Sequence, residues 1–316
     1  MQLRPLTLND KPMFDLYAEN EVGKPCQHTR LSSYAFAPLY IWRDHFTFYW
    51  GELAGHLCVF AKQNDDYFMP ILPIPYEVGS CRYLKVVREA YQFMLESSRN
   101  PHIVRIENVP KEMLRFFKEN GFSATLKETE YLYETETLSR LSGNRYKSKR
   151  SAYNAFVAKH PSVTLTPYCS ADRDACFARC DAWRTERASQ CNDDIYCVML
   201  DNSRAAHRTA IADADALGLI GRVVRINGEI KAYTFGYPLN TDTFCVLFEV
   251  TDLRTKGLAQ FIYREFCREL VGTYRWINAM DDSGLENLRR VKRSYHPTRL
   301  VPSYNIVSPP TVCSQA

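Results

Sequence analysis

One acidic residue interrupts an apolar run in the second half of the chain. Glu249 stands in CVLFEV, where every neighbour is hydrophobic. Burying a carboxylate costs free energy unless it has a partner or a chemical task, so Glu249 is a candidate catalytic base or a ligand for an ammonium group. The alternative is a structural ion pair with Arg222 or Arg225 on the neighbouring hairpin. Arg222 is also a candidate substrate-binding residue.

Two adjacent carboxylates follow a short predicted strand near the C-terminus. Asp281 and Asp282 open a helix in DDSG and together suit one or two ammonium groups of a substrate. The alternative is N-capping of the helix, which needs only one acidic residue. Arg290 on this helix is a further candidate for substrate binding. Lys292 and Tyr295, at its end, are candidate catalytic residues that supply a positive charge or a proton to a developing oxyanion or a leaving oxygen.

A basic segment lies at the middle of the chain. NRYKSKR, residues 144–150, holds four cationic residues in seven together with an aromatic one. Such a run can neutralise phosphates and stack bases. The alternative is a solvated helix that links the two halves of the chain. The candidate phosphate-binding residues are Arg145, Tyr146, Lys147, Lys149 and Arg150.

A short turn, LRTKGLA at residues 253–259, separates an apolar strand from an amphipathic helix. Small residues at Gly257 and Ala259 let backbone N–H groups approach a phosphate, while the following helix presents its positive end. Arg254 is a candidate phosphate ligand, with plain solvent exposure as the alternative. The pattern is short, so it indicates a phosphate cradle only in the right fold.

Composition and missing motifs exclude several classes of protein. The 316 residues are 46% hydrophobic and 24% charged, and the net charge of +4 does not by itself imply nucleic acid. Eleven cysteines, an odd number, suggest reduced thiols, and their spacing predicts no metal site. No signal peptide and no apolar run long enough to span a membrane is evident, so we expect a cytoplasmic protein. Motifs of serine hydrolases, zinc proteases and P-loop enzymes are absent.

The hydrophobic periods of the second half predict the order β-α-α-β-β-β-α-β-α-β after an initial helix at 144–160. Asn227-Gly228, between two β-rich runs, is the strongest hairpin signal in the chain. The predicted strands are SVTLTPY, LIGRVVRI, EIKAYTFGYPL, TFCVLFEV, YRWINA and 299–307, and the predicted helices are 171–188, 199–217, 257–270 and 285–293.

The first half gives nearly the same order, at low sequence identity to the second. Its predicted strands are LRPLTL, HFTFYWGEL, HLCVFAKQ, DYFMPILPI, HIVRIENV and EYLYETE, and its predicted helices are 11–19, 33–42, 82–98 and 111–120. We therefore expect two domains of mixed α/β structure, at 1–140 and 141–307, and a disordered tail at 308–316.

This element order resembles that of GNAT acyltransferases, in which the turn after the fourth strand holds the pyrophosphate of an acyl-CoA. LRTKGLA occupies that turn in the second copy, whereas the first copy has PIPYEVGSC there. The second copy is therefore predicted to carry the site.

Three longer segments resemble the family of the phosphatidylglycerol lysyltransferase C-terminal domain. They are NRYKSKRSAYNAFVAKHP, GEIKAYTFGYPLNTDTFCVLFEV and DDSGLENLRRVKRSYHPTRLVPSY. YAFAPLYIWRDHF in the first half resembles the family's opening Phe-Ala-Asn-x-x-x-Trp-Arg motif, with Pro38 where Asn is usual. The resemblance implies a tandem GNAT fold that moves an aminoacyl group from aminoacyl-tRNA to an acceptor without CoA. In the named enzymes the acceptor is the glycerol hydroxyl of phosphatidylglycerol.

Three hypotheses for function follow. In the first, from the resemblance, an aminoacyltransferase uses residues 145–150 to guide the tRNA end, Asp281 and Asp282 to hold the aminoacyl ammonium, and Glu249 or Tyr295 to move a proton. Its partners are aminoacyl-tRNA and a lipid or other small acceptor, with peripheral membrane contact and no cofactor. The membrane spans of the family's flippase fusions are absent, which weighs against a lipid. The second hypothesis is an N-acyltransferase whose cofactor is acyl-CoA. The third is a non-catalytic tandem domain that binds an amine or a peptide.

Overall fold

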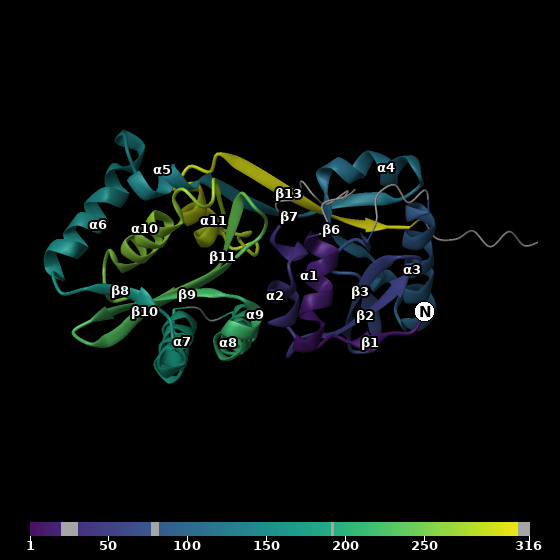
Figure 1. The fold of residues 1–316 in the computed structure, drawn as a ribbon, viewed down its shortest axis with the longest axis horizontal. Coiled ribbons are helices and arrows are strands. Elements are labelled where there is room, and N and C mark those ends of the chain that lie inside the picture. The colour runs from purple at the N-terminus through teal and green to yellow at the C-terminus, as the bar shows by residue number, and fades with distance from the viewer. Residues whose placement is uncertain (20–30, 77–81, 191–192, 309–316) are drawn as a thin grey trace, which may run out of the picture. The chain divides into compact units, whose positions relative to one another are not determined.

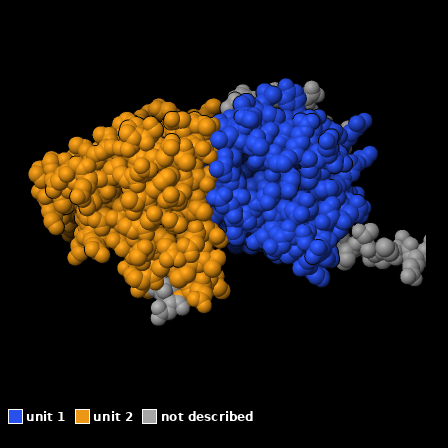
Figure 2. All heavy atoms as spheres, turned by 90° about the horizontal axis from the view of Figure 1, so that it is seen from below, with its two compact units in different colours: residues 1–130, 301–316 blue, residues 131–300 orange. Residues whose placement is uncertain are grey.

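The computed structural model describes residues 1–19, 31–76, 82–190 and 193–308 of the chain. By compactness the chain divides into unit 1, Met1–Glu130 with Val301–Ala316, and unit 2, Tyr131–Leu300 (Figure 2). This division lies ten residues before the expected domain boundary at 140/141, and it assigns the last strand to unit 1. The expected disordered tail, apart from Ser308, lies outside the described residues.

Unit 1 follows the predicted element order, except that the single strand predicted at DYFMPILPI is two short strands, β4 and β5. In it β1, β2, β3 and β4 pair in sequence, and β5 pairs with β3. The elements are β1 (Arg4–Pro5), α1 (Lys11–Glu19), α2 (Phe36–Tyr40), β2 (Thr47–Leu53), β3 (His56–Gln63), β4 (Asp66–Phe68), β5 (Ile74–Pro75), α3 (Tyr83–Ser97), β6 (Ile106–Pro110) and α4 (Leu114–Glu119), with 3-10 turns at Leu8–Asp10, Ser32–Tyr34, Pro101–Ile103 and Lys111–Met113.

Unit 2 follows the same order again. Strand β7 (Ser123–Glu134) begins in unit 1 and ends in unit 2. The elements after it are α5 (Thr135–Arg140), α6 (Lys147–Lys159), β8 (Thr164–Pro167), α7 (Arg173–Ala188), α8 (Asp194–Ala212), α9 (Ala214–Leu217), β9 (Ile220–Ile226), β10 (Glu229–Pro238), β11 (Thr243–Thr251), α10 (Leu258–Leu270), β12 (Trp276–Asn278), α11 (Glu286–Arg293) and β13 (Arg299–Val307), with 3-10 turns at Asn144–Tyr146 and Ser170–Asp172.

The sheet of unit 2 has the strand order β7-β12-β11-β10-β9-β8, and helices cover both of its faces (Figure 1). Helices α5, α6 and α10 lie on one face, and α7, α8 and α9 lie on the other. The predicted hairpin between β9 and β10 is present. Asn227 and Gly228 in its turn have φ of +53° and +85°, as a type I′ turn requires.

The last strand, β13, has the predicted bounds, and it pairs with a strand of unit 1. It pairs antiparallel with β6 and lies between β6 and β7 in the strand order. Its hydrophobic pattern fixes only that it is a strand, because the choice of neighbouring strand depends on register and long-range packing. The domain prediction of 141–307 placed it with unit 2, and compactness places it with unit 1.

Candidate functional site

Two neighbouring strands of unit 2 diverge, and this divergence frames the candidate site. Strand β11 pairs in parallel with β12 only at Thr243, Phe244 and Cys245. Beyond Cys245, β11 stays with β10, whereas the chain after β12 stays with β7, since the Ala279 amide donates to the Tyr131 carbonyl at 3.0 Å. No described strand pairs with this edge of β11 after Cys245. Splayed strands of this kind can admit a ligand to backbone and side chains alike.

A β-bulge in β11 decides which side chains point to each face. Phe235 of β10 pairs with Phe248, while the next residue, Gly236, pairs with Val246, so Leu247 is an extra residue on β11. A bulge of this kind re-aims the side chains that follow it. Gly236 permits the close approach beside the bulge, because a Cβ there would lie 2.4 Å from the Cys245 carbonyl oxygen.

The side chains on either side of the bulge point to opposite faces. Before it, Phe244 packs edge-on against Phe266 of α10, with ring centroids 5.5 Å apart. After it, Phe248 stacks on His207 of α8, with centroids 4.0 Å apart. Strand alternation then turns Glu249 to the face of α10. The sequence pattern marked Glu249 as unusual but did not indicate its face.

Glu249 has no hydrogen bond or ion pair with any residue that the structure describes. Arg222 pairs instead with Glu269, at 2.6 Å between Nε and Oε2, and Arg225 pairs with Asp172. The alternative of a structural ion pair between Glu249 and either arginine is therefore wrong. Arg222 was expected to bind substrate, but its side chain forms this ion pair with Glu269 of α10. Burial raises the pKa of Glu249 to about 8.

Two tyrosines and a thiol lie near Glu249. Its charge contributes, after burial, to raising the pKa of Tyr295, Tyr263 and Cys267. The rings of Tyr263 and Tyr295 meet edge to face, with centroids 5.1 Å apart. Neither phenol oxygen has a hydrogen bond within the described chain. Three polar groups on the face of α10, those of Glu249, Tyr263 and Tyr295, thus lie close together and lack hydrogen-bond partners among the described residues.

Lys149 connects the basic segment to this cluster. Its Nζ lies 4.2 Å from the centroid of the Tyr295 ring, and burial lowers the pKa of the amine. No carboxylate of the described chain pairs with it. Tyr146 is only 1% exposed, and its hydroxyl donates to the Tyr295 carbonyl at 3.0 Å. Tyr146 therefore cannot stack a base, as the sequence suggested, and instead positions Tyr295.

The other members of the basic segment have separate environments. Arg145 and Lys147 are exposed at the start of α6. The His296 ring meets Tyr146 edge-on at 5.3 Å, which brings the end of α11 beside this start. Arg150 donates to the carbonyls of Leu141 and Gly143, so its guanidinium stabilises the connection between α5 and α6. Arg290 on α11 is exposed, with no ion pair to any described residue.

Of the two adjacent carboxylates, Asp282 is occupied by its own neighbours. Arg289 donates to it twice, at 3.0 and 3.2 Å, and the Tyr131 hydroxyl donates at 2.5 Å. The Gly284 amide adds a fourth hydrogen bond. Burial opposes ionisation of Asp282, but these hydrogen bonds prevail and lower its pKa. The N-cap of α11 is Leu285, without a side-chain hydrogen bond, so Asp282 does not cap this helix. Its carboxylate instead stabilises the turn before the helix, and these contacts leave little room for a substrate ammonium.

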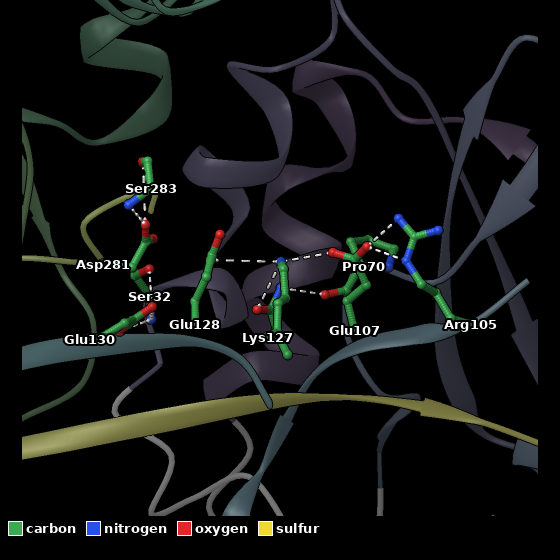
Figure 3. Close-up of polar contacts among 10 residues, drawn as sticks. Ser32, Pro70, Arg105, Glu107, Lys127, Glu128, Glu130, Asp281 and Ser283 are labelled. Atoms are coloured by element: carbon green, nitrogen blue, oxygen red, sulfur yellow. Dashed lines mark hydrogen bonds and ion pairs between the residues drawn. The ribbon is translucent and has the colours of Figure 1, made fainter. Parts of the chain in front are cut away.

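Asp281 and Lys292 also shape the turn before α11. Asp281 accepts from the Ser283 amide at 2.6 Å, as Figure 3 shows. The Lys292 ammonium donates to the carbonyls of Ala279 and Asp281. Tyr133 donates to the Lys292 carbonyl at 2.8 Å. Lys292 was expected to be catalytic, but in the structure its ammonium group stabilises the turn before α11.

The candidate phosphate cradle is packed against α6. Gly257 has a φ of +86°, and a Cβ there would lie 2.5 Å from the Ala152 carbonyl oxygen. The Thr255 amide donates to the Asp252 carbonyl and the Leu258 amide to the Thr255 carbonyl. Two backbone N–H groups of this turn are therefore already hydrogen-bonded and are not free to bind a phosphate.

Arg254, the remaining candidate of this turn, has an 85% exposed side chain. It lies 3.6 Å from Glu186, between Nε and Oε1.

The corresponding divergence in unit 1 is bridged by side chains. There Met69, just after β4, forms a parallel bridge with Ile106 of β6. Beyond it, the side-chain amide of Asn108 donates to the Pro70 carbonyl at 2.9 Å, and the Tyr34 hydroxyl donates to the backbone carbonyl of Asn108 at 3.1 Å.

Lys127 reinforces this bridge in unit 1, through an ion pair with Glu107 at 2.7 Å (Figure 3). These polar groups satisfy one another, unlike those around Glu249.

Sequence reasoning missed Tyr263 and the contact of Lys149 with Tyr295. One signal was available for Tyr263, because its spacing to Cys267 and Leu270, i+4 and i+7, places its polar tip on the apolar face of α10. No local pattern indicates that Lys149 turns inward. Among the described residues, no group of three or more His, Cys, Asp or Glu side chains is arranged to hold a metal ion.

Comparison with known proteins gives the following similarities. A family model described as phosphatidylglycerol lysyltransferase, C-terminal, matches residues 27–307. A solved structure of a conserved protein of unknown function from Bacteroides thetaiotaomicron is 23% identical, covers 97% of this chain and 99% of its own, and has a TM-score of 0.81. No curated protein matches the chain.

Two further solved structures are more distant. The C-terminal domain of a protein assigned as a lysylphosphatidylglycerol synthetase, from Agrobacterium fabrum, has a TM-score of 0.66 at 11% identity and covers 96% of this chain and 91% of its own. The L-PGS of Bacillus licheniformis has a TM-score of 0.59 at 13% identity, with 84% and 85% coverage. The expected mixed α/β, tandem GNAT-like fold is confirmed. No helix in the described ranges has the length and hydrophobicity to cross a membrane.

Proposed function

The chain belongs to the family of the phosphatidylglycerol lysyltransferase C-terminal domain, and from that premise we propose that it transfers an aminoacyl group from aminoacyl-tRNA to a lipid or other small acceptor. One observation carries the proposal. Glu249 lies near the packed rings of Tyr263 and Tyr295 where β11 and β12 diverge, and none of the three side chains has a hydrogen-bond partner among the described residues.

The donor side of this site is basic. Arg145 and Lys147 are exposed where α6 begins, and Arg290 is exposed on the neighbouring α11. Lys149 leads from this surface to the ring of Tyr295. Cations in such an arrangement neutralise the phosphates of a tRNA end and release its counterions. The ester at the 3′ end of the tRNA would then lie beside Glu249.

Glu249 suits proton transfer in this reaction. The acceptor hydroxyl attacks the ester carbonyl carbon and forms a new C–O bond, and its proton passes to the Glu249 carboxylate. The bond to the ribose oxygen then breaks, and Glu249 returns the proton to that oxygen. A pKa of about 8 lies near neutrality, where a group exchanges protons efficiently. A substrate ammonium nearby favours the ionised form that accepts the proton.

Acyl-CoA is the alternative donor, and the turn at residues 253–259 argues against it. The Ala152 carbonyl of α6 lies against Gly257, where a pyrophosphate would have to approach the backbone. The Thr255 and Leu258 amides already donate within the turn. We therefore propose no cofactor. A non-catalytic amine-binding or peptide-binding domain is the remaining alternative, and it predicts binding without transfer.

The proposal is tested by binding and by transfer. An aminoacyl-adenosine with an amide in place of the ester resists hydrolysis and carries the planar group of the donor. We expect it, and not acetyl-CoA, to raise the melting temperature, because a ligand at a hundredfold excess over Kd stabilises the folded state by about 2.7 kcal/mol. Incubation with a mixture of radiolabelled aminoacyl-tRNAs and phosphatidylglycerol vesicles should yield labelled lipid, and small hydroxyl and amine acceptors are tested in parallel.

Glu249→Gln is the informative variant, and Glu229→Gln is its control. Glu229 is exposed and pairs with Lys231 on the β9–β10 hairpin. Glu249→Gln should lower the rate of transfer by about 10²-fold, in line with the loss of a general base. Glu229→Gln should keep the wild-type rate of transfer. Stabilisation by acetyl-CoA alone would favour an acyl-CoA enzyme. Binding of the adenosine analogue without transfer to any acceptor would favour the binding domain.

A further inference from the structure

Two phenol groups in unit 2 are hydrogen-bond donors for which the described residues supply no acceptor. Tyr263 comes from α10, and Tyr295 directly follows α11. Their rings meet edge to face at 5.1 Å. Neither hydroxyl has a hydrogen-bond partner in the described chain, although Glu249 lies close enough to affect the pKa of both.

Separate elements hold each phenol in position. The Tyr295 backbone is fixed by the Tyr146 hydroxyl, which donates to its carbonyl at 3.0 Å. Beside Tyr263, Arg264 donates to the Ser139 carbonyl at 2.9 Å and so fastens α10 to the end of α5. Because both anchors are made without ligand, little reorganisation is needed when an acceptor arrives.

Their chemistry selects the kind of atom they bind. Burial raises the pKa of both phenols, so both keep their protons at neutral pH and act as donors. A donor in a partly buried site binds best to an oxygen that carries negative charge. Glu249, with its own raised pKa, is a poor permanent acceptor near neutrality. The oxygen that gains negative charge in acyl transfer is the carbonyl oxygen of the ester.

We propose that Tyr263 and Tyr295 form the oxyanion-binding pair of the site and donate to the carbonyl oxygen of the aminoacyl ester. This inference rests on the proposed function. When the acceptor oxygen attacks the carbonyl carbon, the π electrons of the C=O bond move to the carbonyl oxygen, and the two O–H groups stabilise the resulting charge. When the ribose oxygen leaves, those electrons re-form the C=O bond. Both phenols keep their protons throughout, and Glu249 carries the acceptor's proton.

The test uses Tyr263→Phe and Tyr295→Phe, each of which removes one oxygen atom. Loss of one oxyanion donor lowers kcat by about 10²-fold to 10³-fold in enzymes of this type. We expect a reduction of that order for each variant, with KM changed less than about threefold, since the charge exists only in the transition state. Tyr274→Phe is the matched control, because Tyr274 belongs to the same apolar cluster and packs on Phe244, with centroids 5.3 Å apart. It should retain the wild-type kcat.

A second measurement separates oxyanion binding from a structural role. Two adenosine analogues are compared by titration calorimetry, one with a planar amide and one with a tetrahedral phosphonate at the position of the ester carbon. Tyr263→Phe should weaken binding of the phosphonate by about 10²-fold and of the amide by less than about threefold. Equal weakening of both analogues would overturn the inference, because general damage to the site does not discriminate between them.

The outcomes distinguish this inference from the proposed function. If the wild-type protein neither binds the amide analogue nor transfers an aminoacyl group, the proposed function fails, and the inference fails with it. If the wild-type protein is active and Tyr263→Phe is equally active with an unchanged preference between the analogues, only the oxyanion pair is refuted.

Discussion

Glu249 combines a candidate chemical role with a cost in stability that depends on pH. Its pKa rises from the usual 4.5 to about 8 on folding, so the folded state binds a proton more tightly than the unfolded state. The stability from this proton is complete below pH 4.5 and is lost as pH rises from 4.5 to 8. The rate of loss is at most about 1.4 kcal/mol per pH unit.

Glu249→Gln should therefore stabilise the protein increasingly as pH rises from 4.5 to 8, because the amide is neutral throughout. Urea unfolding across this range measures the difference from the wild type. Glu229→Gln is the control, since Lys231 lowers the pKa of Glu229 and any pH effect there has the opposite sign. A difference for Glu249→Gln that stays constant with pH would contradict the burial of an unpaired carboxyl group.

His207 has the opposite pH dependence. Its ring is stacked on Phe248, its Nδ1 lies 3.0 Å from the Tyr233 hydroxyl, and burial lowers its pKa from 6.5 to about 3. The folded state therefore keeps this ring neutral, and the stability gained is complete above pH 6.5 and is lost as pH falls from 6.5 to 3.

His207→Phe should flatten the fall in stability between pH 6.5 and 4 by up to about 1.4 kcal/mol per pH unit. At pH 7 it should cost about 1 kcal/mol for the lost hydrogen bond with Tyr233. The free energy of urea unfolding at several pH values tests both. His102 is exposed, so His102→Gln controls for the loss of one histidine. An unchanged slope in His207→Phe would refute the prediction.

At the scale of elements, the contact between α6 and the start of α10 depends on one glycine. A Cβ at Gly257 would lie 2.5 Å from the Ala152 carbonyl oxygen and 2.7 Å from the Phe156 Cβ, and the φ of +86° disfavours other residues. Gly272, just after α10, has a φ of +85° and no atom within 4 Å of such a Cβ. Both glycines therefore have a left-handed backbone conformation, but only Gly257 is closely packed against neighbouring atoms.

Gly257→Ala should destabilise the protein by about 1 kcal/mol more than Gly272→Ala, which bears only the left-handed backbone cost of about 1 to 2 kcal/mol. Chemical denaturation of the two variants gives this difference directly. Equal losses would mean that α6 moves aside without cost, and that the turn at residues 253–259 is open to a phosphate after all.

At the scale of the whole molecule, the last strand ties the C-terminal end of the chain to unit 1. Strand β13 pairs with β6, about two hundred residues earlier, and lies between β6 and β7. A chain that ends at Leu300 would leave both of these strands with an unpaired edge in the middle of a sheet, where backbone groups need partners.

A chain of residues 1–300 should therefore lose cooperative unfolding in unit 1 and tend to aggregate, whereas a chain of residues 1–308 should behave as the full protein does. Hydrogen exchange at the β6 amides is the sharpest readout, because those amides lose protection only if β13 is their partner. Wild-type protection of β6 in the chain of residues 1–300 would refute the pairing.

The sequence by itself determined the element order in both halves, the bounds of β13 and the turn at Asn227-Gly228, because these depend on local periodicity and backbone conformation. It also singled out Glu249, since a carboxylate among apolar residues is visible without a structure. The family resemblance, and with it the fold, came from motifs in the same way.

The tertiary structure decided everything that depends on residues distant in sequence. Strand pairing placed β13 beside β6, and the bulge at Leu247 turned Glu249 toward α10. Long-range packing buried Tyr146, brought Lys149 onto Tyr295 and added Tyr263 to the candidate site. None of these follows from a pattern within one segment, because register and burial are set by contacts that form only when the chain has folded.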